Sequence, residues 1–206
     1  MTNNKREDQK NQTLARIKKS ALLMFAQHGF SISIAKIAEH AGLSKQALMY
    51  HFPSKSILLE SVMKDIEYSS LNSLLQFFSL LLQTDAEQDN AKLEETIAIF
   101  VNQNLWAVLF LRLILENRES YLPDSFRAHH FEIIAELEDR QRRGELRADI
   151  DVAATFTNMN TLLLTTLATA HTRSSITETL QITSSAWFKR RIFSIFSMYR
   201  STLFSS

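Results

Sequence analysis

The sequence predicts an all-helical protein, in which three short N-terminal helices are joined by one long helix to a larger helical body. Glycine and proline are scarce, with three and two copies among 206 residues, so few positions favour a left-handed or chain-breaking backbone. Apolar residues recur at helical spacing along most of the chain. The glycines each follow such a segment and the prolines each precede one, which is where helices end and begin.

The three short helices are expected over residues 13–28, 34–41 and 45–52. Ser33 and Ser44 stand at the N-cap positions of the second and third helices, and Gly42 stands at the turn between them. Pro53 ends the third helix. Short helices joined by so tight a corner are typical of a helix-turn-helix.

Longer helices are expected in the rest of the chain. The first leaves the N-terminal helices at Ser54 and runs to about Gln83, so it would connect the two parts of the molecule. We therefore predict a helix-turn-helix domain over residues 1–54, which we call the head, and a helical body over residues 55–206. The remaining expected helices cover residues 92–117 with an interruption near 102–104, then 124–143, 151–171 and 185–203.

The charge of the chain is distributed unevenly between head and body. Residues 1–55 carry nine basic and three acidic side chains, a net charge of +6, and the remainder carries 14 basic and 19 acidic side chains, a net charge of −5. A basic head on a mildly acidic body is typical of a protein whose head approaches nucleic-acid phosphates. A run of charge is more often an ordinary solvated face, so this observation is weak alone.

The third short helix is predicted to have two distinct faces. At about 100° per residue, counted from Lys45, Leu48 and Phe52 lie together near about 300° to 340°. The opposite arc, from roughly 100° to 240°, is occupied by four other side chains. These are Gln46, Ala47, Tyr50 and His51. The apolar face can pack on the preceding helix, which leaves the second face toward solvent.

The outward face carries groups that suit the major groove of DNA. Gln46 can pair with adenine, Ala47 can contact a thymine methyl group, and Lys45 can reach guanine or a phosphate. Tyr50 and His51 can donate hydrogen bonds to phosphate oxygens. The alternative is an ordinary surface helix, whose polar side chains face solvent without contacting DNA.

Residues 37–55, with the sequence IAEHAGLSKQALMYHFPSK, resemble the signature of the TetR/AcrR family of bacterial transcriptional regulators. The resemblance extends from Thr13 to about Leu59, and the run of further helices agrees with the family's plan. It implies that Lys45, Gln46, Ala47, Tyr50 and His51 sit at DNA-contacting positions. It also implies phosphate contacts by Ser33, Ser44 and Lys55.

The resemblance further implies a homodimer, formed by the last two helices, that binds a palindromic operator in double-stranded DNA. Apolar stripes in the two helices could supply the interface. The candidate interface residues are Phe156, Met159, Leu163 and Leu167 in one helix, and Phe188, Ile192, Ile195 and Tyr199 in the other. Such stripes are more often plain core, so the dimer prediction depends on the resemblance.

The middle of the body would enclose a cavity for a small-molecule effector, if the resemblance extends that far. The candidate lining is apolar and aromatic with few polar groups, as in many ligand pockets. It comprises Phe100, Asn104, Trp106, Phe110, Phe131 and Met159. Core packing explains the same residues at least as well. His129 and His130 are adjacent in sequence, so they make a poor metal pair, and we expect them to be surface or satisfied groups.

Several classes of protein are disfavoured. The chain has no cysteine, which excludes disulfides and thiol nucleophiles and suits a reducing cytoplasm. Its first ten residues do not resemble a signal peptide, and its most apolar run, residues 105–115, is shorter than the ~18 to 20 residues of a membrane span. No phosphate-binding loop, nucleophile elbow or paired metal-ligand motif is present. We therefore expect no catalytic residues, no metal and no cofactor.

The sequence is thus expected to encode a DNA-binding regulator, which acts as a repressor and is released from its operator by a small, largely apolar effector. A sequence-independent architectural DNA binder is one alternative, and a helical binding module without DNA activity is another. The polar outward face around Gln46 favours sequence-specific binding over both.

Overall fold

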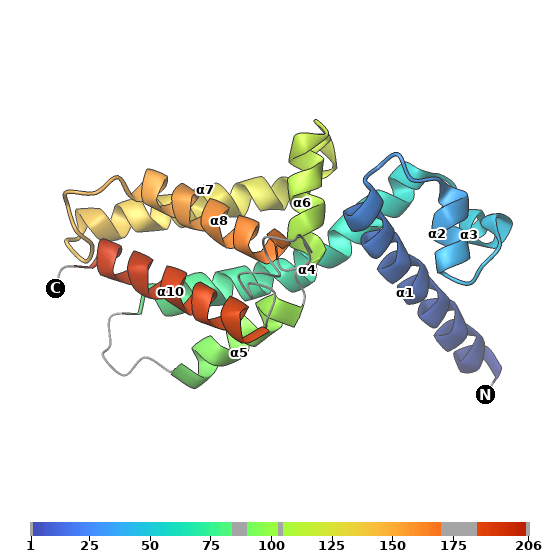
Figure 1. Cartoon of the computed structure of the whole chain (residues 1–206), viewed down its shortest axis with the longest axis horizontal. Coiled ribbons are helices and arrows are strands. Elements are labelled where there is room, and N and C mark those ends of the chain that lie inside the picture. Colours follow the sequence, from blue (N-terminus) through green and yellow to red (C-terminus); the bar gives the residue numbers. More distant parts are fainter. Residues whose placement is uncertain (1, 84–89, 103–104, 170–184, 205–206) are drawn as a thin grey trace.

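The computed structural model describes residues 2–83, 90–102, 105–169 and 185–204, and its regular elements within these ranges are helices. The molecule is elongated, with the head at one end and the body at the other (Figure 1). The predicted all-helical fold class is confirmed. Within the described residues, no helix is both long enough and apolar enough to span a membrane.

The head contains α1 (Thr2–His28), α2 (Ile34–His40) and α3 (Lys45–His51). The two predicted caps are present: Ser33 Oγ accepts a hydrogen bond from the amide of Lys36 at 3.3 Å, and Ser44 Oγ accepts one from Ala47 at 3.1 Å. Between these helices, Gly42 adopts a φ of 66° and the Leu43 amide donates to the carbonyl of Ala38 at 2.9 Å. The chain therefore turns sharply after α2.

Helix α1 begins eleven residues earlier than predicted. It ends at His28 as expected, but its first turns extend to Thr2. The side chains of residues 5–12 are exposed, so this extension has no apolar face that a periodic pattern could reveal. Its N-terminal end and α3 lie at the same end of the molecule (Figure 1).

Helix α4 (Lys55–Leu81) runs without interruption from the head into the body (Figure 1). Its first half packs on α1, where Leu58, Val62 and Met63 join the core of the head. An ion pair between Lys18 and Asp65, at 2.9 Å, joins the same two helices. The continuous helix makes α4 a mechanical link between the two parts.

The body follows the predicted order of helices closely. It contains α5 (Asn90–Asn102), α6 (Leu105–Leu115), the 3-10 turn η1 (Glu119–Tyr121), α7 (Asp124–Arg142), α8 (Val152–Thr169) and α10 (Ser185–Leu203). The predicted interruption near 102–104 separates α5 from α6, although residues 103–104 themselves lie outside the described residues. Helix α8 packs against α6, α7 and α10, so it forms the centre of the body.

The two apolar stripes predicted to face a second copy of the chain face the core of one chain instead. All eight side chains are at most 9% exposed, because α8 and α10 turn these stripes toward each other and toward neighbouring helices. They are Phe156, Met159, Leu163, Leu167, Phe188, Ile192, Ile195 and Tyr199. These side chains therefore have almost no accessible surface left for a partner. The sequence pattern correctly indicated that they are buried, but they are buried within one chain and not between two chains.

The C-terminal end of α1 is fastened to α6. Arg112 donates through Nε to the carbonyl of Ala26 at 2.7 Å and through Nη2 to the carbonyl of Gln27 at 3.1 Å. Both carbonyls belong to the last turn of α1, which has no further amides in the helix to bind them. Directly after the last residue of α6, Glu116 Oε2 accepts a hydrogen bond from the amide of Phe30 at 3.3 Å. We call these contacts the α1–α6 joint.

Gly29 lies within this joint and cannot carry a side chain there. Its φ is 73°, and a Cβ atom would lie 2.6 Å from Glu116 Oε1 and 3.1 Å from Arg112 Nη1. Both neighbours are held by the hydrogen bonds just described, so neither can move away freely. A residue other than glycine would therefore disturb both the backbone and the joint.

We expect Gly29→Ala to lower the free energy of unfolding by about 1 to 2 kcal/mol for the left-handed backbone and a further ~1 to 3 kcal/mol for overpacking. Gly144→Ala is the matched control, because Gly144 has a φ of 78° but open space around the new Cβ. Urea unfolding of the two variants measures the difference. Equal losses of stability would show that the joint does not restrict position 29.

Candidate DNA-binding surface and effector cavity

Helix α3 presents one buried and one exposed face. Leu48 and Phe52 are 0% and 5% exposed and belong to the same core cluster as Ile37 and Ala38 of α2. Tyr50, on the other side of the helix, is 84% exposed. This is the orientation that the helical spacing predicted, because the apolar residues fix the rotation of α3 against α2.

The predicted base-reading and phosphate-contacting groups of α3 lie at or near the surface. Lys45 and Gln46 are exposed, while Ala47 and His51 are half-buried. The rings of Tyr50 and His51 meet edge to face with centroids 5.3 Å apart. The helix therefore offers an ammonium, an amide and a phenol to a partner outside the head.

The serine hydroxyls predicted to contact phosphate are also helix caps. Each uses an oxygen lone pair to accept a backbone N–H, which leaves its own O–H free to donate. Ser33 and Ser44 are both exposed, so a phosphate could reach them. A cap and a phosphate contact are thus compatible at one side chain.

Lys55 holds the loop between α1 and α2. Its Nζ donates to the carbonyl of Phe30 at 2.6 Å and to that of Ile32 at 3.2 Å. The side chain is half-buried, and these two bonds engage two of its three N–H groups. Lys55 therefore positions the loop that leads into Ser33, and one N–H is left for a phosphate.

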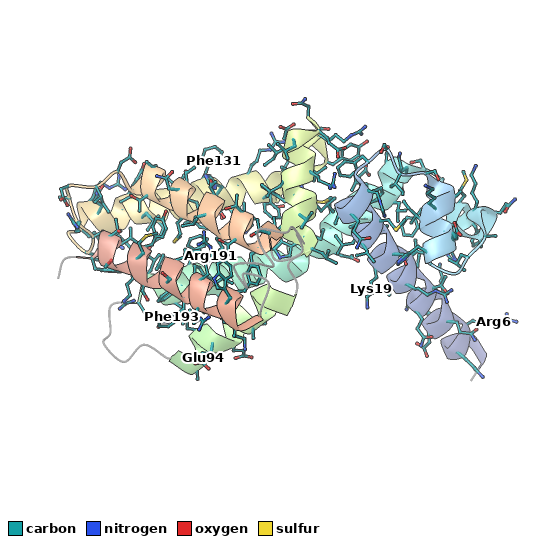
Figure 2. The ribbon with its side chains drawn as sticks, in the orientation of Figure 1. Arg6, Lys19, Glu94, Phe131, Arg191 and Phe193 are labelled. Atoms are coloured by element: carbon teal, nitrogen blue, oxygen red, sulfur yellow. The ribbon has the colours of Figure 1, made fainter. Side chains whose placement is uncertain are left out.

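The extended part of α1 adds basic side chains that the prediction for the site did not include. Lys5, Arg6 and Lys10 are exposed in this segment, and Arg16 and Lys19 continue the basic character along the helix. Arg6 lies toward the N-terminal end of α1 (Figure 2). The net positive charge of residues 1–55 already indicated a basic surface. The spacing of apolar residues, however, did not show that this basic segment continues helix α1.

A cavity of about 240 Å³ lies in the body between α6, α7 and α8. Trp106 and Phe110 of α6, Phe126 and Phe131 of α7, and Phe156 of α8 form aromatic walls. The rings of Phe110 and Phe126 lie 5.4 Å apart. Phe131 is 68% exposed on the outer side of the body, at the edge of the cavity (Figure 2).

Half of the predicted cavity lining is found there. Trp106, Phe110 and Phe131 line the cavity, whereas Met159 is buried in the core and is absent from the lining. Phe100 lies in α5 with a side chain outside the described residues, and Asn104 lies outside them altogether. The prediction missed other lining residues on α7, on α8 and just before α7, because helical spacing does not show which side chains meet across a space between helices. The missed residues include Leu122, Phe126, His130, Asn160 and Leu164.

The two adjacent histidines both line the cavity. His129 is satisfied as predicted, since its Nδ1 lies 2.6 Å from the carbonyl oxygen of Ser125. The ring of His130 packs against Phe156 with centroids 4.9 Å apart. Burial lowers the pKa of the His130 imidazole below its ordinary value, which favours the neutral form of the ring.

Asn160 is a further polar residue of the lining. Among the described residues its Oδ1 is buried and has no hydrogen-bond partner. Such an atom is uncommon, since most buried polar atoms are paired. Across the described ranges, no group of three or more acidic, histidine or cysteine side chains is arranged to hold a metal ion.

Residues 17–62, which span α1 to the start of α4, match the family model described as bacterial regulatory proteins, tetR family. No curated protein sequence matches the chain. The matched segment contains the whole of α2 and α3, together with their serine caps.

Solved structures share the fold along almost the whole chain. The ketosteroid transcriptional regulator KstR2 of Mycobacterium tuberculosis has a TM-score of 0.65 and 15% identity, with 94% of this chain and 95% of that chain covered. A TetR family transcription regulator from Marinobacter aquaeolei has a TM-score of 0.58 and 16% identity, with 96% and 98% covered. GusR of Salmonella enterica has a TM-score of 0.54 and 23% identity, with 93% and 95% covered.

The head carries the family's own sequence pattern, and its two-faced α3 has the geometry of a recognition helix. The body has the fold of solved structures described as transcriptional regulators. The chain is thus similar to transcriptional regulators of the TetR family: residues 17–62 match the family's model, and almost the whole chain shares the fold of solved structures described as members of that family.

Proposed function

We propose that this regulator is a repressor, which binds a palindromic operator as a homodimer and is released by a small, largely apolar effector in the body. The observation that carries the proposal is the outward face of α3, with Gln46 and Tyr50 exposed while Leu48 and Phe52 are buried. A helix fixed in this way can enter the major groove without losing its packing.

The proposed division of contacts follows the chemistry of each group. Gln46 reads adenine, Ala47 contacts a thymine methyl group, and Lys45 reaches guanine or a phosphate. Tyr50 and His51 donate to phosphates. The hydroxyls of the two helix caps and the basic arm of α1 add further backbone contacts, which strengthen binding without selecting sequence.

We propose residues 1–54 as the DNA-binding domain and residues 55–206 as the effector-binding and dimerisation domain. The dimer interface would use the outward faces of α8 and α10, because their inward stripes are already buried. From Val152 to Thr169, α8 contains no charged residue, although several of its side chains are exposed. On α10, Phe193 and Met198 are each 46% exposed. Uncharged and apolar exposed faces are typical of the centre of a protein interface.

The effector would act through α6. This helix contributes Trp106 and Phe110 to the cavity, and the α1–α6 joint is formed by its Arg112 and by Glu116, which directly follows its last residue. A ligand that changes the position of α6 would therefore shift the head relative to α4. In a dimer, such a shift changes the separation of the two recognition helices and disfavours the operator-bound state.

Selection of bound sequences from random duplex DNA tests the proposed function. A specific regulator should yield a palindromic site bound about 10³-fold or more tightly than random DNA at a fixed salt concentration. Equal affinity for selected and random DNA would identify an architectural DNA binder instead. A reporter gene placed behind the selected site then gives the sign of regulation.

We expect Gln46→Ala to relax sequence preference at one base pair of each half-site, with a loss of about 1 to 3 kcal/mol for the preferred base. Gln76→Ala, at an exposed position of α4 in the body, is the control. Binding of both variants to operators changed one base pair at a time measures the effect. An unchanged base preference would remove Gln46 from the base-reading role.

Ser44→Asp separates the two roles of Ser44. Aspartate is as good an N-cap as serine, so we expect the free energy of unfolding to change by less than ~0.5 kcal/mol. The added negative charge beside phosphate should weaken operator binding by about tenfold to a hundredfold. Ala91→Asp adds the same charge to an exposed site at the start of α5, outside the proposed dimer faces, and should leave DNA binding unchanged. If Ser44→Asp binds the operator normally, the N-terminus of α3 is remote from phosphate.

Arg112→Leu tests the α1–α6 joint as the route of effector action. A compound that releases the wild-type protein from its operator should still bind the variant, but its effect on operator affinity should fall from the roughly 5- to 150-fold typical of allosteric coupling toward none. Arg142→Leu is the control, since Arg142 is exposed on α7 and pairs with Asp139. If the compound still lowers the operator affinity of Arg112→Leu as strongly as that of the wild type, the effector acts on the head through contacts other than the α1–α6 joint.

A further inference from the structure

A groove between α5 and α10 is separate from the aromatic cavity of the body. Five residues line it, and none of them lines the cavity between α6, α7 and α8. They are Glu94, Ile97, Lys189, Arg190 and Phe193, and we call this space the α5–α10 groove. Its volume of about 380 Å³ falls within the ~300 to 1,000 Å³ of sites that bind small molecules. Glu94 and Phe193 mark its position on two neighbouring helices (Figure 2).

The apolar part of the groove consists of one side chain from each helix. Ile97 of α5 is 3% exposed and forms the floor, whereas the ring of Phe193 on α10 is 46% exposed. An apolar group that covers this ring removes hydrocarbon surface of both partners from water, which favours binding. The groove therefore suits a ligand with an apolar portion.

The polar part of the groove carries charges of both signs. Glu94 lies one turn before Ile97 on α5, and Lys189 and Arg190 are adjacent on α10. All three charged side chains are exposed, and across the described residues none of them has an ion-pair or hydrogen-bond partner. By contrast, the arginines at the C-terminal end of α7 all pair with acidic side chains. The groove thus holds one carboxylate and two cations that a ligand can still engage.

This combination of charges disfavours a ligand with a single charge. A simple anion would be attracted by Lys189 and Arg190 but repelled by Glu94, and a simple cation would meet the opposite pattern. A zwitterion can place each of its charges beside the opposite charge of the protein. Its apolar portion can then cover Phe193.

We propose that the α5–α10 groove binds an α-amino acid with an apolar side chain. The carboxylate of the ligand pairs with Lys189 and Arg190, its ammonium group pairs with Glu94, and its side chain packs on the ring of Phe193. The groove is thereby a second ligand site of the body, which depends neither on the proposed effector cavity nor on DNA binding.

The proposed dimer leaves room for this ligand. Glu94 and Ile97 belong to α5, which is not part of the proposed dimer faces. At about 100° per residue, Met198 lies about 140° around α10 from Phe193. A partner that covers Met198 therefore leaves the side of Phe193 that faces α5 open.

Three probes with the same phenyl ring and carbon chain test the proposed ligand class. Phenylalanine carries both charges, 3-phenylpropanoate lacks the ammonium group, and phenethylamine lacks the carboxylate. Each is titrated at pH 7 into the full chain with 13C-labelled isoleucine methyl groups. The methyl signal of Ile97, assigned by its absence in Ile97→Val, reports binding at the groove itself and not at the cavity.

The charge variants should alter the preferences among the probes selectively. In Glu94→Gln, the preference for phenylalanine over 3-phenylpropanoate should fall about threefold to fivefold. In the double variant Lys189→Gln and Arg190→Gln, the preference over phenethylamine should fall by a similar factor. These ratios cancel the different hydration of the probes. Glu95→Gln and Lys64→Gln change exposed residues outside the lining and should keep the wild-type preferences.

Unchanged melting temperatures show that the variants fold, because all the substituted charges are exposed. Absence of any shift in the Ile97 signal with phenylalanine would overturn the proposal and identify the charges as ordinary solvated side chains. Unchanged preferences in Glu94→Gln or in the double variant would also overturn it, since the groove would then not recognise both charges of the ligand.

Discussion

The position of the head depends on how the last turn of α1 is bound. The carbonyls of Ala26 and Gln27 have no amide partners within their own helix, and the guanidinium of Arg112 supplies two N–H donors to them. A cation at the C-terminal end of a helix is also favoured by the helix dipole. Because Gly29 leaves no side chain between the two helices, α6 can approach closely enough to make these bonds. The geometry of the head is thereby tied to a helix that lines the cavity of the body.

Local features of the sequence predicted the head well. Serine caps, a glycine in the left-handed region and a proline after α3 each act within a few residues, so they mark helix boundaries without knowledge of the tertiary fold. The rotation of α3 was also predictable, because Leu48 and Phe52 fall on one side of a short helix and there is only one core for them to enter. The extension of α1 to Thr2 was not predictable from periodicity, since its exposed side chains make no apolar contacts that repeat.

The body shows what helical periodicity cannot decide. The stripes that contain Leu163 and Ile192 were correctly expected to be buried, but spacing does not say whether a stripe meets its own chain or a second copy. The cavity posed a similar difficulty. Asn160 lies four residues after Phe156 on α8, and sequence alone could not show that both line a space bounded by α6 and α7. Long-range packing decides these cases, and it depends on the positions of several helices at once.

Helix α6 contributes to both the cavity wall and the α1–α6 joint. Because the helix is rigid, a displacement at one of these sites is transmitted to the other. Along α6, Trp106 and Arg112 are six residues apart, which corresponds to about 9 Å of helix. A helix of this length moves as a nearly rigid body, so under the proposed mechanism a ring inserted beside Trp106 would change the angle at which Arg112 meets α1. The hydrogen bonds of the joint tolerate little change in distance or angle. They must therefore either move α1 with α6 or break, and both responses reach the head without any change in the internal packing of α2 and α3.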